Sequence, residues 1–252
     1  MTNILLSRGI VGSPSMIKHF KPFINSSDEV LIVALSHFPK YIPDEKAYNQ
    51  YVAHSPIIKA LRVSIDPMED TSTNLYEKGG EYYQKMIESF QPYGIDESQI
   101  KWIHYYKDNH ESAIKKIKKA DIIYFPGGAP DLMMMRINAF GIKEALEAHQ
   151  GLFIGSSAGA MIQMASYHIS PDVDYPSFSY EQGLELLKGF SIEVHYRRRK
   201  KQKAALRKIN RAFHHPIYAI PDDGAIIITR ESIKCINSAK KIYDNRGVVR
   251  SK

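Results

Sequence analysis

Short apolar runs recur along the chain, and amphipathic stretches lie between many of them. Two of these runs, at residues 30–35 and 122–125, are apolar throughout, which is typical of strands that are covered on both faces. The pattern predicts strands at residues 4–7, 30–35, 100–105, 122–125, 152–155, 191–194, 217–220 and 225–229. Helical periodicity predicts helices at residues 14–23, 74–91, 111–118, 142–149 and 203–213.

This alternation of strands and helices predicts an α/β fold with three layers, in which helices cover both faces of a mostly parallel sheet. No repeat, low-complexity tract or linker divides the sequence, so residues 1–252 are expected to form a single domain. The stretch at residues 36–72 has no clear periodicity. It is either an insertion or lid over a site, or an ordinary packed excursion of the chain.

The composition is that of a soluble globular protein, with 44% hydrophobic and 24% charged residues. No apolar stretch reaches the roughly 20 residues needed to cross a bilayer. The first residues form a short apolar run that is expected to be a strand, not a signal peptide. A single cysteine, Cys235, excludes an internal disulfide and a cysteine-based metal cluster. We therefore expect a cytoplasmic protein that does not associate with membranes; a monomer and a homodimer both stay open.

The net charge of +7 comes from one segment. Residues 188–211 contain ten basic residues and one acidic residue. The net charge of this segment is therefore larger than the net charge of the whole chain. Nucleic-acid binding by such a segment normally also needs aromatic side chains for base stacking. Only Tyr196 and Phe213 flank the basic run, so the sequence favours a solvated helix face or an acidic substrate over a nucleic acid.

The most informative segment is a buried strand that runs into Gly155-Ser156-Ser157-Ala158-Gly159 and then into small, helix-favouring residues. Such a G-x-S-x-G turn between strand and helix holds the central serine in a strained conformation with its hydroxyl exposed. The spacing centres the pattern on Ser157, although Ser156 is an adjacent alternative. The backbone N–H of Ala158, directly after this serine, is the expected first donor to a reacting oxyanion.

A second glycine turn follows the strand at residues 122–125, in the segment Pro126-Gly127-Gly128. In a parallel sheet, both turns lie at the carboxyl edge, where ligands bind. Gly128 is therefore our first choice for the second oxyanion donor, and Gly127 is the reserve; an ordinary tight turn is the alternative.

A serine nucleophile needs a general base, and histidine is the usual one. Among ten histidines, His195 stands out because it directly follows an expected strand. His37 and His168 remain possible site residues. No spacing of histidines and carboxylates suits a metal ion, and no glycine loop with a lysine suits a phosphate, so no metal or cofactor is expected.

Four segments together resemble the aspartyl dipeptidase (peptidase E) and cyanophycinase family of serine peptidases, which have a class I glutamine amidotransferase-like fold. They are the strand with its Gly-Gly turn, the turn around Ser157, the segment from Gly183-Leu184 to Val194-His195, and Ala219-Ile220-Pro221-Asp222-Asp223-Gly224. The resemblance implies a Ser157–His195–Asp222 triad. Asp223 and Asp172 are alternative positions for the acid.

The same resemblance implies hydrolysis of an amide bond in a short peptide or isopeptide with an aspartyl group near the scissile bond. Arg197 and Arg199 follow His195 closely and could bind such a carboxylate in a bidentate manner. Two features depart from the family pattern. Ala129 stands where Asn or Asp is common, and the implied triad acid is an aspartate, whereas the dipeptidase branch has a glutamate in this role. The alternative interpretation is therefore an amidotransferase-like protein that binds small molecules or peptides with little or no catalysis.

Overall fold

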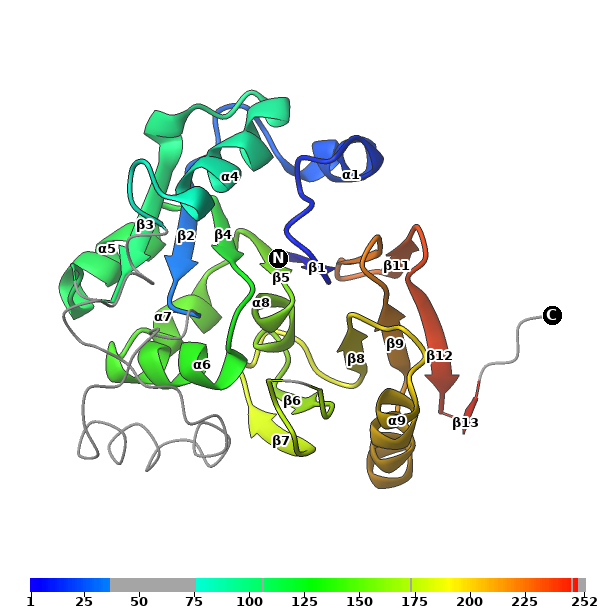
Figure 1. Ribbon diagram of the computed structural model, residues 1–252. Coiled ribbons are helices and arrows are strands. Elements are labelled where there is room, and N and C mark those ends of the chain that lie inside the picture. The colour runs from blue at the N-terminus through cyan, green and yellow to red at the C-terminus, as the bar shows by residue number, and fades with distance from the viewer. Residues whose placement is uncertain (37–75, 106, 173, 246, 249–252) are drawn as a thin grey trace.

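The computed structural model describes residues 1–36, 76–105, 107–172, 174–245 and 247–248 (Figure 1). Its strands are β1 (Thr2–Leu6), β2 (Val30–Ala34), β3 (Ile100–His104), β4 (Ile122–Phe125), β5 (Leu152–Ser156), β6 (Ser166–Ile169), β7 (Ser179–Gln182), β8 (Ser191–Val194), β9 (Ile217–Ile220), β10 (Ala225–Ile228), β11 (Ile233–Ile236), β12 (Lys240–Asp244) and β13 (Gly247–Val248). Its α-helices are α1 (Pro14–Phe20), α4 (Glu81–Phe90), α5 (His110–Lys119), α6 (Pro130–Ala139), α7 (Lys143–Ala148), α8 (Ala158–Met161) and α9 (Lys200–Phe213). Short 3₁₀ helices are η1 (Lys21–Phe23), η4 (Gln91–Tyr93) and η5 (Glu97–Gln99).

The central sheet has seven strands in the order β11-β10-β1-β5-β4-β2-β3. The five strands from β1 to β3 in this order run parallel. At the other edge, β10 pairs with β1 and β11 pairs with β10, both in antiparallel fashion. Leu6 is paired with Ser156 in the register of β1 and β5, so both strands end at the same level of the sheet. The mostly parallel α/β sheet predicted from the sequence is confirmed.

Helices cover both faces of this sheet, as the three-layer prediction requires (Figure 1). Alternate residues of one strand pack into two different cores: Ile122 and Tyr124 face α1 and α4, while Ile123 and Phe125 face α5, α6, α7 and α8. Burial on both faces explains why these strands are apolar along their whole length.

A smaller sheet, in the order β13-β12-β9-β8, stands beside the central one and carries α9 (Figure 1). In it, β8 and β9 are parallel neighbours, with Val194 opposite Ile220. A third pair of strands, β6 and β7, forms an antiparallel hairpin. The parallel pairing of β8 and β9 places the residues that follow them at one common edge.

Several predicted boundaries were wrong for local reasons. The helix predicted at residues 14–23 ends at Phe20, where a 3₁₀ turn containing Pro22 takes over, because proline has no N–H to continue the helix. The helix predicted at 74–91 begins only at Glu81, after Gly79 and Gly80, and residues 74–75 lie outside the described residues. The remaining predicted strands and helices agree with the structure within about three residues at each end.

The proposed lid at residues 36–72 falls almost entirely outside the described residues, as does His37. Among the helices that the structure does describe, none combines the length and the apolar character that a bilayer span requires.

Candidate active site

The site lies where the carboxyl ends of β1 and β5, in the central sheet, meet those of β8 and β9, in the smaller sheet. Ser7 and Arg8 follow β1 and Ser157 follows β5, while His195 follows β8 and Asp222 comes two residues after β9. Side chains from four strand ends, far apart in the sequence, are thus brought to one place. This is the general position of ligand sites in open α/β sheets.

The turn after β5 holds Ser157 at φ 50° and ψ −114°, a conformation that non-glycine residues rarely adopt. Small neighbours make the turn possible. A Cβ atom added at Gly155 would lie 2.1 Å from the carbonyl oxygen of Gly159, and one added at Gly159 would lie 2.0 Å from that of Phe125. The G-x-S-x-G pattern is therefore required by close backbone approach, and it lifts the Ser157 side chain out of the turn.

Ser156, the adjacent alternative, is 3% exposed, and its hydroxyl is 3.0 Å from the hydroxyl of Tyr124. Tyr124 belongs to the core that faces α1 and α4, and burial raises its pKa to about 12. Ser156 is thus a packed core residue with a partner of its own, and Ser157, at the centre of the G-x-S-x-G spacing, is the serine that lines the cavity.

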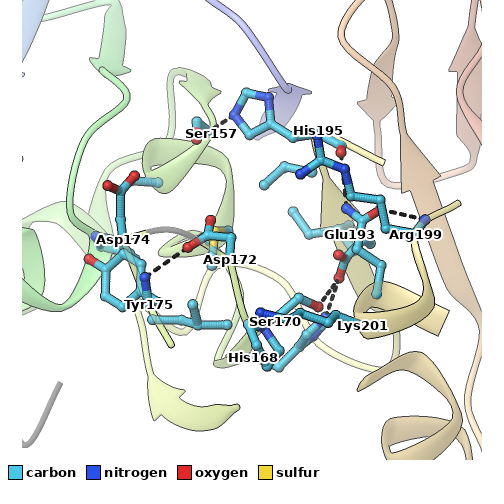
Figure 2. A pocket seen from close by; sticks show the side chains of 18 of the residues that line it. Ser157, His168, Ser170, Asp172, Asp174, Tyr175, Glu193, His195, Arg199 and Lys201 are labelled. Atoms are coloured by element: carbon cyan, nitrogen blue, oxygen red, sulfur yellow. Dashed lines mark hydrogen bonds and ion pairs between the residues drawn. The ribbon is translucent and has the colours of Figure 1, made fainter. Parts of the chain in front are cut away.

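A continuous line of hydrogen bonds joins three of the predicted residues. His195 Nε2 lies 2.9 Å from Ser157 Oγ, and His195 Nδ1 lies 2.8 Å from Asp222 Oδ1. Figure 2 shows the imidazole of His195 facing the Ser157 hydroxyl at the rim of the pocket. The arrangement places a hydroxyl, an imidazole and a carboxylate in the order needed to activate the hydroxyl oxygen.

Two arginines bind the other oxygen of the Asp222 carboxylate. Arg197 Nη2 is 2.6 Å and Arg8 Nη2 is 3.1 Å from Asp222 Oδ2. Partial burial by itself raises the pKa of Asp222, but the hydrogen bonds from His195, Arg197 and Arg8 outweigh it, so this pKa lies well below its ordinary value. Asp222 is consequently a carboxylate at any pH near neutrality and can hold the proton-bearing Nδ1 of His195 in place.

The loop that carries His195 is fixed by two side chains that the sequence reasoning missed. The buried Ser7 hydroxyl accepts a hydrogen bond from the backbone N–H of His195 at 2.9 Å and donates one to the carbonyl oxygen of Ile220. Gln202 accepts from the N–H of Arg197 and donates to the carbonyl of His195, both at 2.9 Å. The one available sequence signal for Ser7 was its place directly after a buried parallel strand.

Gly128 and Ala158, the predicted oxyanion donors, both line the cavity at Ser157. Within the described part of the chain, the backbone N–H groups of these two residues have no hydrogen-bond acceptor. Gly127, the reserve, also lies next to the serine: a Cβ added there would be 3.4 Å from the Cβ of Ser157. The turn after β4 is therefore packed directly against the turn at Gly155–Gly159 that carries Ser157, which we call the elbow.

The cavity next to Ser157 has a volume of about 500 Å³, and its walls carry opposite charges (Figure 2). Asp172 and Asp174 lie on one side, in the loop between β6 and β7, together with Tyr175. Arg199 and Lys201 lie on the other side, at the start of α9. A cavity of this size accepts a small molecule or a few residues of peptide.

The remaining predicted acids do not contact His195. Asp172 accepts a hydrogen bond from the backbone N–H of Tyr175 at 2.8 Å, across the cavity from the histidine. The carboxylate of Asp223 accepts from the hydroxyl of Ser238 at 2.7 Å. Of the three candidate positions for the acid, Asp222 is the one that the structure brings to His195.

Beside these residues, the cavity wall contains a buried pair: His168, which the sequence left as a possible site residue, and Glu193, which it did not single out. His168 Nε2 lies 2.6 Å from Glu193 Oε2, and Ser170 donates a hydrogen bond to the same oxygen at 2.8 Å. The side chains of His168 and Glu193 are 2% and 4% exposed. The pair connects β6 to β8 two residues before His195. Among the described residues, no group of three or more His, Cys, Asp or Glu side chains is arranged to hold a metal ion.

The sequence profile of a known protein family matches most of the chain. The sequence profile of Peptidase family S51 matches residues 72–236, which is well over half of the chain and includes Ser157, His195 and Asp222. The chain belongs to peptidase family S51. Its resemblance to peptidase E, inferred from four sequence segments, is thereby confirmed. No curated protein matches the chain in sequence.

Solved structures share the fold of this S51 family member at low sequence identity. A candidate peptidase E from Listeria monocytogenes EGD-e has 17% identity and a TM-score of 0.55, with 93% of this chain and 96% of that chain covered. A peptidase from an acI-B1 Actinobacterium has 12% identity and a TM-score of 0.60, with coverage of 96% and 94%. These matches support the peptidase E-like α/β fold along nearly the whole chain.

Proposed function

We propose that the chain is a serine peptidase that cleaves an amide bond in a short peptide or isopeptide carrying a carboxylate near the scissile bond. The observation that carries this proposal is the hydrogen-bonded line from Asp222 through His195 to Ser157. Both bonds are 2.8–2.9 Å long, within the reach that proton transfer requires. Membership of peptidase family S51 supplies the class of bond.

In the first step, Ser157 Oγ attacks the amide carbonyl carbon while His195 Nε2 takes the hydroxyl proton. The oxygen of the tetrahedral intermediate accepts hydrogen bonds from the N–H groups of Ala158 and Gly128; each such donor is worth about 3 kcal/mol in other serine hydrolases. The carbon–nitrogen bond then breaks, and His195 gives its proton to the leaving amine. Water then attacks the acyl-enzyme while His195 Nε2 takes one of its protons. His195 returns this proton to Ser157 Oγ as the acyl group leaves.

Asp222 acts on the imidazole and does not exchange protons with the substrate. Its carboxylate fixes the tautomer of His195 that has the proton on Nδ1, and it stabilises the imidazolium that forms during attack. Arg197 and Arg8 hold this carboxylate from its far side. Arg197 is thus occupied by the triad acid, which leaves Arg199, with Lys200 and Lys201, as the cationic groups that line the cavity.

These cations support the preference for an acidic substrate. A carboxylate held by Arg199 at one wall would leave the amide of the same short peptide within the cavity that opens at Ser157. The test compares hydrolysis of Asp-X and Leu-X dipeptides and of β-aspartyl dipeptides. We expect kcat/KM to be highest for an acidic substrate; equal values for Asp-X and Leu-X would contradict the acidic preference.

A second test addresses catalysis itself. Ser157→Ala should lower kcat by about 10⁴-fold or more, since loss of the nucleophile removes the covalent route. Labelling by a fluorophosphonate probe should occur in the wild type and be absent in Ser157→Ala, with Ser156→Ala as the matched control that keeps its label. A wild-type protein that binds the peptides but neither cleaves them nor reacts with the probe would instead be a binding protein.

A further inference from the structure

One face of α9 carries a row of cationic side chains. Lys200, Lys203, Arg207, Lys208 and Arg211 are exposed. Lys200, Lys203, Arg207 and Arg211 follow one another at intervals of three or four residues, which places them on one side of the helix, and Lys208 lies beside Arg207. The opposite face, formed by Gln202, Ala205, Leu206 and Ile209, is buried. The helix contains no acidic residue.

These charges are not neutralised by the protein itself. In the ranges of the chain that the structure describes, none of these five side chains lies within ion-pair distance of a carboxylate. Pairs such as Lys203–Arg207 and Arg207–Arg211 are four residues apart, and like charges at this spacing destabilise a helix. A bound polyanion would remove this repulsion, so the face has the charge complementary to an acidic chain.

The basic face is continuous with the candidate active site. Arg199, Lys200 and Lys201, at the start of α9, line the cavity that contains Ser157 and His195. From this end the helix extends for 14 residues, or about 21 Å, which equals the length of about six residues of extended peptide. A peptide whose end occupies the cavity could therefore continue along the helix.

Phe213, the aromatic residue of α9, already has aromatic neighbours and is not free to stack on a nucleotide base. Phe213 is 45% exposed, but it already stacks on Tyr180, with ring centroids 4.9 Å apart, and on His215, with centroids 5.4 Å apart. Sequence-independent binding of single-stranded nucleic acid uses free ring faces beside the cations. The surface therefore fits an acidic polypeptide better than a nucleic acid.

We propose that the exposed face of α9, defined by Lys200, Lys203, Arg207, Lys208 and Arg211, binds an acidic polypeptide segment that is joined to the cleaved end of the substrate. This proposal rests on the proposed peptidase function and extends it: the substrate is the end of an acidic chain, and residues beyond the scissile bond contribute to its selection. The attraction is electrostatic and largely exposed, so it must weaken as salt increases.

The experiment compares a cleavable aspartyl dipeptide unit with the same unit joined, at either end, to six glutamates. We expect the wild type to cleave one of the extended substrates with a kcat/KM at least tenfold above that of the short one at low salt. In K203E/R207E/R211E this ratio should fall to about one, and 0.5 M salt should reduce the ratio in the wild type. A matched control, K115E/K118E/K119E, reverses three exposed lysines on α5 and should keep both the rates and the ratio.

An unchanged ratio in the α9 variant would overturn the docking proposal while leaving the peptidase proposal intact. If no peptide is cleaved, binding of fluorescent hexaglutamate to Ser157→Ala still tests the α9 face by anisotropy. Weaker binding in the α9 variant than in the α5 control supports the face, and equal binding overturns it. Tighter binding of a single-stranded oligonucleotide of equal charge than of hexaglutamate would also overturn the choice of a polypeptide.

Discussion

The hydroxyl of Ser7, at the end of β1, accepts a hydrogen bond from the backbone N–H of His195 at 2.9 Å, although 188 residues separate them in the sequence. The same hydroxyl donates to the carbonyl of Ile220, two residues before Asp222. One buried side chain next to β1 thus contacts both strand ends of the smaller sheet that precede His195 and Asp222. The Ser7 hydroxyl therefore links the end of β1 to the loop in which His195 lies 2.9 Å from Ser157.

Ser7→Ala should therefore lower catalysis without removing any group that touches the substrate. The variant leaves a backbone donor and a backbone acceptor without their partner, which costs about 1–3 kcal/mol of unfolding free energy. We expect kcat to fall by about tenfold, since small misplacements of a base cost about this much or more, with KM nearly unchanged. Steady-state kinetics and urea unfolding check both effects.

Ser15→Ala is the matched control for this variant, because Ser15 is exposed at the start of α1 and should change neither quantity. A Ser7→Ala protein with the wild-type kcat would show that the loop around His195 keeps its position without the Ser7 hydroxyl.

The second prediction follows from the lowered pKa of Asp222. A carboxyl whose pKa is lower in the folded state than in the unfolded state stabilises the fold above its unfolded pKa, which is about 3.9 for aspartate. This contribution is lost as the pH falls from there through the lower folded pKa. The wild type should thus be more stable than Asp222→Asn at pH 6–7, and the difference should shrink below about pH 4.

Thermal unfolding of both proteins between pH 2.5 and 7 measures this difference. Asp223→Asn is a suitable control, because the carboxylate of Asp223 contacts Ser238 instead of the arginines. A constant difference between wild type and Asp222→Asn over this pH range would mean that the two arginines do not stabilise the Asp222 carboxylate in solution.

The sequence predicted most of the central sheet because its strands are apolar along their length, and it predicted Ser157 because a sharp turn between strand and helix needs Gly155 and Gly159. It missed α6, in which Leu132, Met133 and Ile137 are buried together with polar residues, so that no amphipathic period is visible. It also missed β11 and β12, whose exposed lysines give them no apolar run.

The parts of the site that the sequence could not provide are contacts between side chains and distant backbone. Ser7 and Gln202 act on the backbone of the His195 loop, and Glu193 pairs with His168 on another strand. Such pairs have no characteristic spacing in one sequence. In contrast, His195 could be proposed because it directly follows an expected strand, and Asp222 because its segment resembles the family pattern. The structure adds that these two strands are parallel neighbours.

Close backbone approach at the elbow gives a third prediction. In Gly159→Ala, the new Cβ would lie 2.0 Å from the carbonyl oxygen of Phe125, which is backbone and cannot rotate away. Strand β4 and the elbow must separate, which costs about 1–3 kcal/mol or more of unfolding free energy. Because the turn after β4 carries Gly128, the same movement should lower kcat. Chemical denaturation and kinetics measure the two effects, and wild-type values for both would contradict the tight packing.

The last prediction concerns the buried pair in the cavity wall. His168→Ala leaves the Glu193 carboxylate, 4% exposed, with Ser170 as its remaining hydrogen-bond donor among the contacts described above. Removing one member of a buried charge pair costs about 3–5 kcal/mol of unfolding free energy, because the other member stays buried without its partner. Replacing both members by apolar residues of similar size costs much less. We therefore expect His168→Leu/Glu193→Leu to unfold at a higher urea concentration than His168→Ala. A double-mutant cycle with His168→Leu and Glu193→Leu as its single variants completes the test; strictly additive losses would show that the two side chains do not depend on each other.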